Sequence, residues 1–526
     1  MRQVKLYDTT LRDGAQGEGI SYSVTDKIRI AKELDSLGVH YIEGGWPGSN
    51  PKDMEFYLKM AKSRLKNARL VAFGSTRKAH IKASEDRNLK ALIKSKAKIV
   101  TIFGKTWDLH IKDVLKTSLE ENLNMIKDSV SFLVSKGLTI FYDAEHFFEA
   151  YKANQDYSLK CLLVAKEAGA KAVILCDTNG GTLTSEVSRV IREVRPKINV
   201  DLGIHCHNDA DLAVANSLAA VEAGADMVHG TINGYGERCG NADLIPIIAN
   251  LKLKLSINCI SDGKLKDLTK VSHFVSELSN MKQRNDQPYT GTSAFAHKGG
   301  VHINAVMKNP KTYEHINPEL VGNRRRILVS ELAGKTGVLI RAKGLELDLS
   351  KEDPKTKKIH KLIQQLEHQG YHFEAAEGSF ELLIKKALKQ YKKFFDLQGF
   401  KVVVEKQSDK KITSEAIIKI RVKGTQEHTA AEGDGPVNAL DNALRKALKY
   451  FYPTLSKMHL SDFKVRVLDE KAGTAAKVRV LIQSQDETDT WSTIGVHENI
   501  IEASWQALVD SIEYKLLKDE GAQSRA

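Results

Sequence analysis

The chain has 526 residues, of which 42% are hydrophobic and 28% are charged. A chain of this length exceeds one ordinary hydrophobic core, so we expect roughly two to four domains. No apolar run reaches the roughly 18 residues that span a bilayer, and the start, MRQVKLYDTT, lacks the apolar stretch of a signal peptide. We therefore expect a cytoplasmic globular protein that does not contact membranes.

The net charge of +13 does not indicate nucleic-acid binding. The basic residues are spread along the chain, without an aromatic-interleaved basic segment or a recognition motif. The five cysteines are an odd number and include no C-x-x-C pair, which is typical of a reducing compartment and argues against a disulfide framework.

Short β-prone runs alternate with helical patterns throughout the first half of the chain. The eight runs span 4–10, 39–46, 69–75, 98–104, 138–146, 171–181, 201–209 and 227–233. Mostly apolar strands that alternate with helices predict a parallel sheet covered on both faces, and eight such units predict closure. We therefore predict an α/β fold, a (β/α)8 TIM barrel, over residues 1–275.

The segment SVTDKIRIAKELDSLG, residues 23–38, predicts the first helix of this barrel. Thr25 is predicted to cap its start, Leu34 lies on its apolar face, and Gly38 ends it.

Polar side chains follow most of the predicted strands at their C-terminal ends, where TIM barrels carry their catalytic groups. We expect them to converge on one mouth of the barrel. They are Arg12, Asp13, Glu43, Asp143, Glu145, Asp177, Thr178, His205 and His207.

The segment GIHCHNDADL, residues 203–212, contains a pair of histidines on one strand face. Side chains alternate along a strand, so His205 and His207 share a face and Cys206 takes the other. Together with Asp13, the two imidazoles leave open coordination positions, which suits a catalytic divalent cation. Because no sulfur ligand takes part, Mg, Mn, Co and Zn all remain possible.

Three motifs carry a resemblance to a known family. LYDTTLRDGAQ (6–16), HCHND (205–209) and GYGERCGNADL (234–244) resemble the metal-dependent acyl-CoA aldol enzymes with a TIM barrel. That superfamily includes 2-isopropylmalate, homocitrate and citramalate synthases and hydroxymethylglutaryl-CoA lyase. The resemblance implies a TIM barrel with a divalent metal.

The resemblance continues through HKGGVHINAVMKNPKTYEHINPELVGNRRR (297–326) into a C-terminal region similar to the synthases' allosteric domain. Lyases of the superfamily lack this half, so the synthases are favoured. IEGGWPGSNPKD (42–53) and FYDAEHFFEAYKAN (141–154) look like the citramalate synthase branch. A 2-isopropylmalate synthase and a non-catalytic amino-acid sensor are the alternatives.

The implied reaction condenses acetyl-CoA with pyruvate and hydrolyses the thioester, as the first step of a threonine-independent isoleucine pathway. The resemblance implies that Asp13, His205, His207 and Asn241 bind the metal. Arg12 would bind substrate and stabilise the alkoxide or enolate oxygen, since its guanidinium is never neutral; a structural ion pair is the alternative.

Two further residues of the barrel are implied in the reaction. Thr178, in CDTNGG, would contact the 2-oxo acid, and simple turn chemistry is the alternative. Glu145, in DAEH, matches a catalytic glutamate of the synthases, and a buried ion-pair acid is the alternative.

His302 and Tyr313 match the synthases' catalytic histidine and tyrosine beyond the barrel. In that family this segment reaches the mouth of the partner subunit, so we expect a homodimer. His302 could remove the methyl proton directly or through water. Relatives often carry an acid two residues later, where this chain has Asn304, which leaves the orientation of His302 open.

The chain repeats itself near its C-terminus. FKVVV (400–404) recurs as FKVRV (463–467), and GPVNALDNALRKAL (435–448) recurs as GVHENIIEASWQAL (495–508). We predict two α+β units packed as one regulatory domain over 391–526, after helical linker subdomains over 276–390.

Glycines before a helix expose backbone amides, which suits an amino-acid carboxylate. The segments 431–440 and 491–500 are therefore candidate effector loops. The resemblance implies isoleucine as effector, and a dimerisation domain without a ligand is the alternative.

Overall fold

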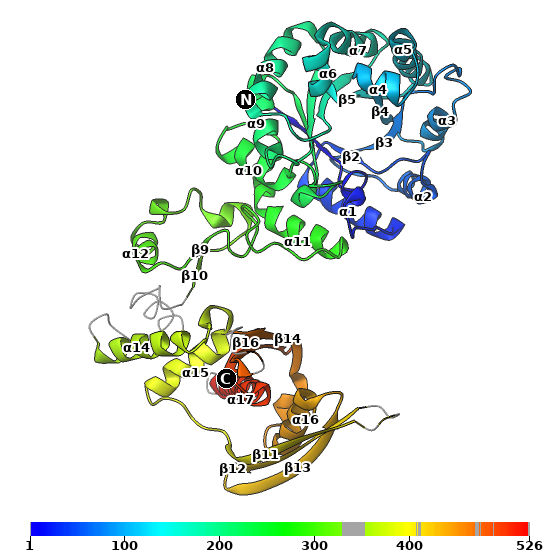
Figure 1. Cartoon of the computed structure of the whole chain (residues 1–526). Coiled ribbons are helices and arrows are strands. Elements are labelled where there is room, and N and C mark those ends of the chain that lie inside the picture. The colour runs from blue at the N-terminus through cyan, green and yellow to red at the C-terminus, as the bar shows by residue number, and fades with distance from the viewer. Residues whose placement is uncertain are drawn as a thin grey trace. The chain divides into compact units, whose positions relative to one another are not determined.

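The computed structural model describes residues 2–328 and 353–523, apart from 407, 409–411, 469–472, 474 and 488. The chain divides into two compact units (Figure 1). The first comprises Met1–Phe295 with Ile316–Arg325, and the second comprises Ala296–His315 with Arg326–Ala526. One stretch of the predicted linker region, 329–352, lies outside the described residues.

Eight parallel strands form a closed barrel in the first unit, in the order β1 to β8, with β1 paired to both β2 and β8. This confirms the predicted (β/α)8 barrel (Figure 1). The strands are β1 Lys5–Asp8, β2 Tyr41–Glu43, β3 Arg69–Ser75, β4 Ile99–Lys105, β5 Thr139–Glu145, β6 Ala172–Asp177, β7 Asp201–Cys206 and β8 Met227–Gly230.

Helices surround the barrel on its outside (Figure 1). They are α1 Val24–Leu37, α2 Pro51–Met60, α3 Arg87–Lys94, α4 Asp108–Asp113, α5 Leu119–Ser135, α6 Phe147–Ala153, α7 Gln155–Glu167, α8 Thr184–Val194, α9 Ala213–Ala223, α10 Leu244–Leu253 and α11 Leu268–Leu278. Four short 3-10 turns accompany them, at η1 Gly14–Gln16, η2 Arg195–Lys197, η3 Ile232–Gly234 and η4 Asp262–Asp267.

The start of α1 differs from the prediction. Ser23, and not Thr25, caps the helix, because the Ser23 side chain accepts from the backbone of Asp26. The Asp26 carboxylate in turn accepts from the backbone of Ser23, which completes a capping box. Gly38 ends the helix in the left-handed conformation at φ 97°, as predicted.

The barrel strands bury both of their faces. One face fills the barrel interior, where Tyr7, Phe141 and Ile174 belong to one apolar cluster. The other face, which includes Leu6 and Val173, packs in the large cluster that contains the surrounding helices. The interior side chains nearest the C-terminal ends of the strands therefore form the floor of the mouth.

The second unit begins with short elements. A two-stranded sheet pairs β9 Ala296–His297 with β10 Arg326–Ile327. The helices are α12 Gly300–Lys308, α14 Pro354–His368 and α15 Glu377–Ala387, with 3-10 turns η5 Pro310–Thr312 and η8 Phe373–Ala375. A further turn, η6 Pro318–Val321, belongs to the first unit.

The C-terminal region of this unit shows the predicted repeat. The first copy is an antiparallel sheet of β11 Asp396–Glu405, β12 Thr413–Val422 and β13 Thr425–Gly433, covered by α16 Pro436–Leu448. The second copy, after η9 Pro453–Lys457, consists of β14 His459–Val467, β15 Val478–Gln485, β16 Thr490–His497 and α17 Ile500–Gln523.

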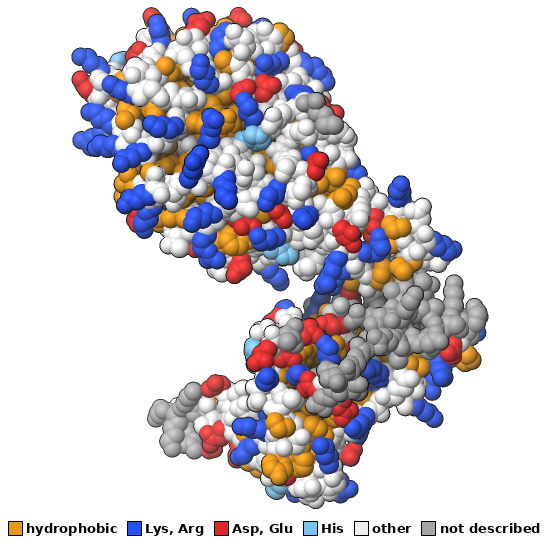
Figure 2. Space-filling view, turned by 180° about the vertical axis from the view of Figure 1, so that it is seen from behind, with side chains coloured by type: hydrophobic (Ala, Val, Ile, Leu, Met, Phe, Trp, Pro, Cys, Tyr) orange, Lys and Arg blue, Asp and Glu red, His pale blue; other side chains and the backbone are white. Residues whose placement is uncertain are grey.

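None of the helices among the described residues has the length and apolarity that crossing a membrane requires. Lys and Arg side chains are scattered among acidic and uncharged ones over the face shown in Figure 2.

Candidate metal and substrate site

The four candidate metal ligands of the sequence lie together at the C-terminal end of the barrel. Asp13 follows β1, His205 lies near the end of β7, and His207 comes directly after that strand. Asn241 forms an isolated bridge with His207. The barrel closure therefore brings together residues that lie far apart in the sequence.

Asp13 is the centre of this group. Its Oδ2 lies 3.6 Å from Nε2 of His205 and 3.8 Å from Nε2 of His207. The side-chain amide of Asn241 donates to its Oδ1 at 2.9 Å. Among the described residues, Asp13, His205 and His207 form a group that could hold a metal ion, with ligand atoms within 4.8 Å of one another.

The charge states of this group suit a cation. Burial alone would raise the pKa of Asp13, but Arg12 and the two histidines hold it well below its usual range. Burial lowers the pKa of His205 to about 3 and also lowers that of His207. At neutral pH the group thus combines one carboxylate with two neutral imidazoles, whose nitrogen lone pairs are available to a metal.

The hydrogen bonding of the candidate donor atoms also suits a cation. Oδ1 of Asn241 is buried without a hydrogen-bond partner in the described structure, and Nε2 of both histidines faces Asp13. Unpaired buried polar atoms are rare, and a role in binding an ion is one ordinary reason for them. Two imidazoles, a carboxylate and an amide oxygen form a ligand set for a divalent metal.

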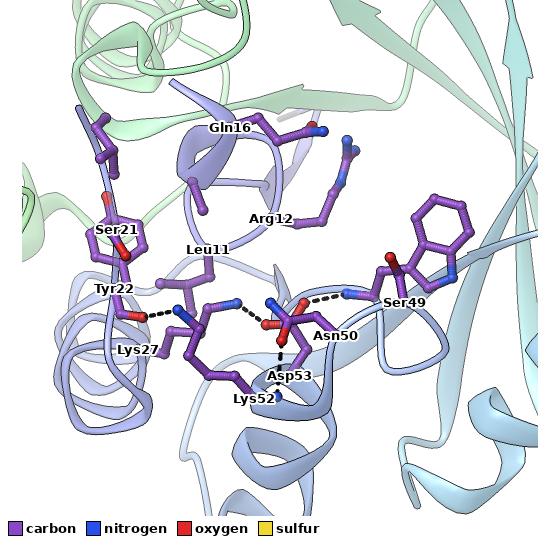
Figure 3. Close-up of a pocket in the computed structure, with 13 residues that line it drawn as sticks. Leu11, Arg12, Gln16, Ser21, Tyr22, Lys27, Ser49, Asn50, Lys52 and Asp53 are labelled. Carbon is purple, nitrogen blue, oxygen red and sulfur yellow. Dashed lines mark hydrogen bonds and ion pairs between the residues drawn. The ribbon is translucent and has the colours of Figure 1, made fainter. Parts of the chain in front are cut away.

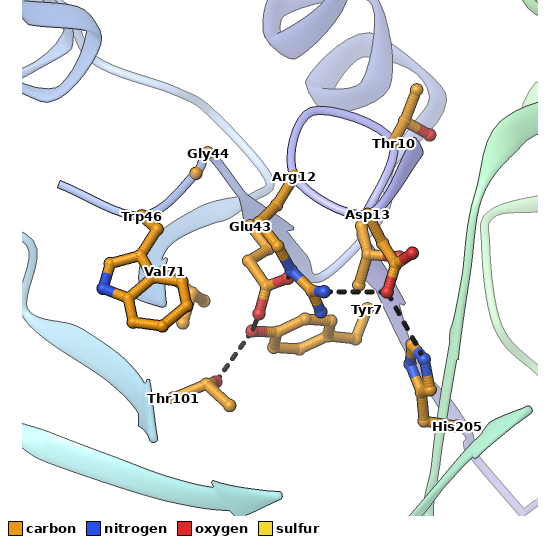
Figure 4. A network of polar contacts seen from close by, with 12 residues as sticks. Tyr7, Thr10, Arg12, Asp13, Glu43, Gly44, Trp46, Val71, Thr101 and His205 are labelled. Atoms are coloured by element: carbon orange, nitrogen blue, oxygen red, sulfur yellow. Dashed lines mark hydrogen bonds and ion pairs between the residues drawn. The ribbon is translucent and has the colours of Figure 1, made fainter. Parts of the chain in front are cut away.

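Arg12 joins the metal group to a second buried network (Figure 4). Its Nη1 donates to Oδ2 of Asp13 at 2.7 Å, and its Nε donates to Oε2 of Glu43 at 2.5 Å. The Tyr7 hydroxyl donates to the other oxygen of Glu43 at 2.6 Å and contacts the Thr101 hydroxyl at 2.7 Å. Although burial opposes its charge, these two carboxylates raise the pKa of Arg12, which stays protonated.

The aromatic surroundings also fix the Arg12 guanidinium. Its central carbon lies 3.9 Å from the centroid of the Phe73 ring. Phe73 stacks on Phe103, and Trp46 meets both rings edge-on at 5.7 and 5.6 Å. Arg12 is thereby held in one orientation by two carboxylates and one ring face.

A cavity of about 230 Å³ adjoins Arg12 at this end of the barrel (Figure 3). Gln16, Tyr22 and Trp46 contribute to its lining. Lys27 donates to the Asp53 carboxylate at 2.5 Å, so this buried lysine has a local counter-charge.

Glu145 and Thr178 lie on neighbouring strand ends. The Glu145 carboxylate forms an ion pair with Lys105, its register neighbour at the end of β4. The Thr178 hydroxyl accepts from the backbone N–H of His146 at 2.9 Å. The backbone carbonyl of Thr178 accepts from Arg238 at 2.7 Å.

His302 and Tyr313 lie in the second compact unit. Their rings stack with centroids 4.1 Å apart, and 46% of Tyr313 is exposed. The structure thus brings the four ligand candidates and Arg12 together, has Glu145 and Thr178 on the same barrel end, and pairs His302 with Tyr313.

Sequence reasoning missed several residues of the site. Tyr7 and His229 stack with ring centroids 3.8 Å apart below the metal group. The alternation of side chains along a strand could have identified these two residues, because it separates the interior face, on which Tyr7 and Glu43 lie, from the exterior face. Lys105 and His146 carried no such signal, because their contacts depend on strand register and backbone conformation.

Three family models match the chain. "HMGL-like" matches residues 3–275, "Homocitrate synthase post-HMGL domain-like" matches 289–370, and "LeuA allosteric (dimerisation) domain" matches 374–516. The first model covers the whole barrel with its metal group. The chain therefore belongs to the HMGL-like family of TIM-barrel enzymes.

Full-length relatives narrow the class. An (R)-citramalate synthase of Geobacter sulfurreducens is 55% identical over 99% of both chains. A 2-isopropylmalate synthase of Methanocaldococcus jannaschii is 31% identical over 98% of this chain and 96% of its own. A solved HMG-CoA lyase of Bacillus subtilis covers 54% of this chain and 97% of its own, with 20% identity and a TM-score of 0.46. Within the family, the chain thus groups with the citramalate synthases.

Proposed function

We propose that the chain condenses acetyl-CoA with pyruvate and water to give citramalate and free CoA, as the first step of an isoleucine pathway that does not use threonine. The near full-length similarity to an (R)-citramalate synthase carries the proposal. The convergence of Arg12, Asp13 and two histidines supports it, because this chemistry needs an activated 2-oxo group.

In this proposal, Asp13, His205, His207 and Asn241 hold a divalent metal, with Mn, Mg, Co and Zn as candidates. Such a metal would supply Lewis-acid polarisation of the 2-oxo group. The carboxylate of Asp13 and the neutral imidazoles suit a cation, and that cation together with the charge of Arg12 would attract an anionic substrate.

Arg12 and Thr178 bind the 2-oxo acid. Glu43 and Asp13 occupy Nε and Nη1 of Arg12, so its second terminal nitrogen is the one left to face the negative oxygen that forms at C2. Thr178 donates its hydroxyl hydrogen to the substrate carboxylate.

Glu145, His302 and Tyr313 are the residues that we assign to proton transfer. A base, His302 acting directly or through water, removes a methyl proton from acetyl-CoA, and the carbon that loses the proton attacks C2 of pyruvate. Glu145 orders a base or the water that cleaves the thioester. We propose that the active protein is a homodimer, which the match to the LeuA allosteric (dimerisation) domain supports.

We propose isoleucine as feedback effector of the C-terminal domain. The match to the LeuA allosteric domain supports this role. A cavity of about 490 Å³ in the second unit is lined in part by Val437 and Asn438, which belong to the first candidate effector loop, 431–440. Functionally, we divide the chain into a catalytic domain over residues 1–275, a linker over residues 276–390 and a regulatory domain over residues 391–526.

The test is CoA release from acetyl-CoA with pyruvate, 2-oxoisovalerate or 2-oxoglutarate, each with and without chelator. We expect CoA release with pyruvate but not with the other two acids. A chelator should abolish this release, and adding back a divalent metal should restore it. Isoleucine, and not leucine, should inhibit. Preference for 2-oxoisovalerate would make the chain a 2-isopropylmalate synthase, and no release with any acid would favour the sensor.

A further inference from the structure

One peptide group at the barrel mouth is held from both sides by threonine hydroxyls. It joins Glu145, the last residue of β5, to His146. Its carbonyl, on Glu145, accepts from the Thr106 hydroxyl at 2.6 Å. Its N–H, on His146, donates to the Thr178 hydroxyl at 2.9 Å. The loops after β4 and β6 therefore fix the orientation of this peptide between them.

The backbone of His146 makes this arrangement possible. It adopts the left-handed conformation, with φ 57° and ψ 36°, between β5 and α6. Non-glycine residues rarely adopt it, although histidine tolerates it better than most, and such strain clusters at functional sites.

The His146 ring lies in a buried aromatic environment. The side chain is buried, at 7% exposure, and its ring lies 4.2 Å from His110 and 5.8 Å from Trp107, measured between centroids. Burial is the main reason that its pKa falls to about 3, so the ring is neutral at physiological pH. The ring is thus packed as a neutral group and brings no charge to the turn.

The two threonines differ in what they have left to offer. A hydroxyl has one hydrogen to donate. Thr106 uses its hydrogen on the Glu145 carbonyl, whereas Thr178 accepts from His146 and keeps its hydrogen. Thr178 can therefore donate to an anionic group while the peptide fixes its oxygen.

The Glu145 side chain is held independently. Its carboxylate pairs with Lys105, and the two residues are register neighbours on β5 and β4. The backbone and the side chain of Glu145 are therefore both anchored at the end of β4, through Thr106 and Lys105.

We propose that the Glu145–His146 peptide, held by the left-handed backbone of His146, is a positioning element that aims the Thr178 hydroxyl at the carboxylate of a bound 2-oxo acid and aligns Glu145 with it. His146 is thus a positioning residue, and its backbone matters more than its imidazole. The inference rests on the proposed substrate role of Thr178.

The test compares side chains at position 146 by their tolerance of positive φ. His146→Val should raise the KM for the 2-oxo acid about 10- to 100-fold, as expected when one hydrogen bond to a charged group is lost. Valine is β-branched and disfavours this conformation. His146→Gly and His146→Asn also lack the imidazole but accept positive φ, so both should stay within a few-fold of the parent KM.

A double-mutant cycle separates positioning from general damage. Thr178→Val alone should raise the same KM, and adding His146→Val to it should produce no further rise. Thr106→Val should lower kcat more than it raises KM, and Thr106→Ser, which keeps the hydroxyl, should restore kcat. Equal KM values for the valine and glycine variants, or additive effects in the cycle, would overturn the inference.

The cycle is run with pyruvate and with 2-oxoisovalerate, because both carry the carboxylate that Thr178 would bind. Turnover of only 2-oxoisovalerate would refute the proposed pyruvate specificity and still test the positioning element. Turnover of pyruvate with an unchanged KM in Thr178→Val would overturn the inference and leave the reaction standing.

Discussion

The barrel and the C-terminal repeat bury their strands in opposite ways. β6 of the barrel is buried along its whole length, and β12 of the repeat alternates between exposed and buried residues. The first pattern belongs to a parallel sheet covered on both faces, and the second to an antiparallel sheet with one face in water.

The difference decides where chemistry can sit. In the repeat, the buried face is mostly apolar, with Ile418 and Leu440 in one core and Ile482 and Leu508 in another. In the barrel, the interior face changes from apolar to polar toward the mouth, where Asp143 and His205 are at most 5% exposed. In the barrel, opposite charges stabilise the buried charged groups, as at Arg12. The result is a reactive site.

The largest expected effect comes from a substitution at the polar end of the barrel. His205→Ala should lower activity by at least about 10³-fold, because it removes a proposed metal ligand. Metal per chain, measured by mass spectrometry after dialysis, should fall with it. Cys206→Ala on the opposite face of the same strand is the control, and it should keep its metal. A fully loaded His205→Ala protein would exclude this residue as a ligand.

The next largest effect comes from a substitution in the core of the C-terminal repeat. Trp491→Ala should reduce the free energy of unfolding by about 3–5 kcal/mol, since it empties a large core position. Trp491 is 1% exposed, and its indole N–H donates to the Ser511 hydroxyl at 3.0 Å. Urea unfolding checks the value, with Trp491→Phe as the milder control. A loss below about 1 kcal/mol would contradict close packing here.

A pH effect sharpens the comparison. Burial raises the pKa of Asp8 in the barrel to about 7. A carboxyl group whose pKa is higher in the folded state than in the unfolded state contributes stability to the fold at low pH. This contribution is complete below the unfolded-state pKa and is lost as pH rises through about 7. Asp8→Asn, which does not titrate, should therefore gain roughly 2–3 kcal/mol relative to the parent between pH 5 and pH 8.

The measurement is the difference in unfolding free energy between Asp8→Asn and the parent at each pH. Other titrating groups cancel in that difference. A difference that stays constant from pH 5 to pH 8 would mean that Asp8 is already ionised in the folded barrel.

The smallest effect concerns the first helix. Ser23→Ala should reduce stability by about 1 kcal/mol, because it removes the capping oxygen. Thr25→Ala is the matched control, since this exposed threonine makes no cap, and it should change stability by less than about 0.5 kcal/mol. Thermal unfolding of both variants checks the order, and the reverse order would restore Thr25 as the cap.

Periodicity was sufficient to predict the barrel, because each strand is a short apolar run between helical patterns. Strand ends were harder. The run 171–181 contains β6, but the strand stops at Asp177, whose carboxylate turns to the Thr182 hydroxyl at 2.8 Å. The Ser23 cap was present in the sequence as a Ser-x-x-Asp pattern, which the apolar spacing obscured.

Asp13, His205 and His207 could be brought together from strand alternation and barrel closure, which follow from residue order, whereas Asn241 was indicated only by the family resemblance. The Lys105–Glu145 pair depends on the register of β4 against β5, which the apolar runs leave free. The left-handed turn at His146 depends on a backbone angle, for which histidine is only a weak indication.

The pairing of β1 with β8 also has a consequence for the folding pathway. Asp13 reaches His205 and His207 only after the first strand has met the last, which is the strand pairing of greatest sequence separation in the barrel. Contacts of such separation form slowly, because the closing of a long loop precedes them. Metal uptake at the proposed site should therefore mark barrel closure, and its rate during refolding should follow the slowest phase of the first unit.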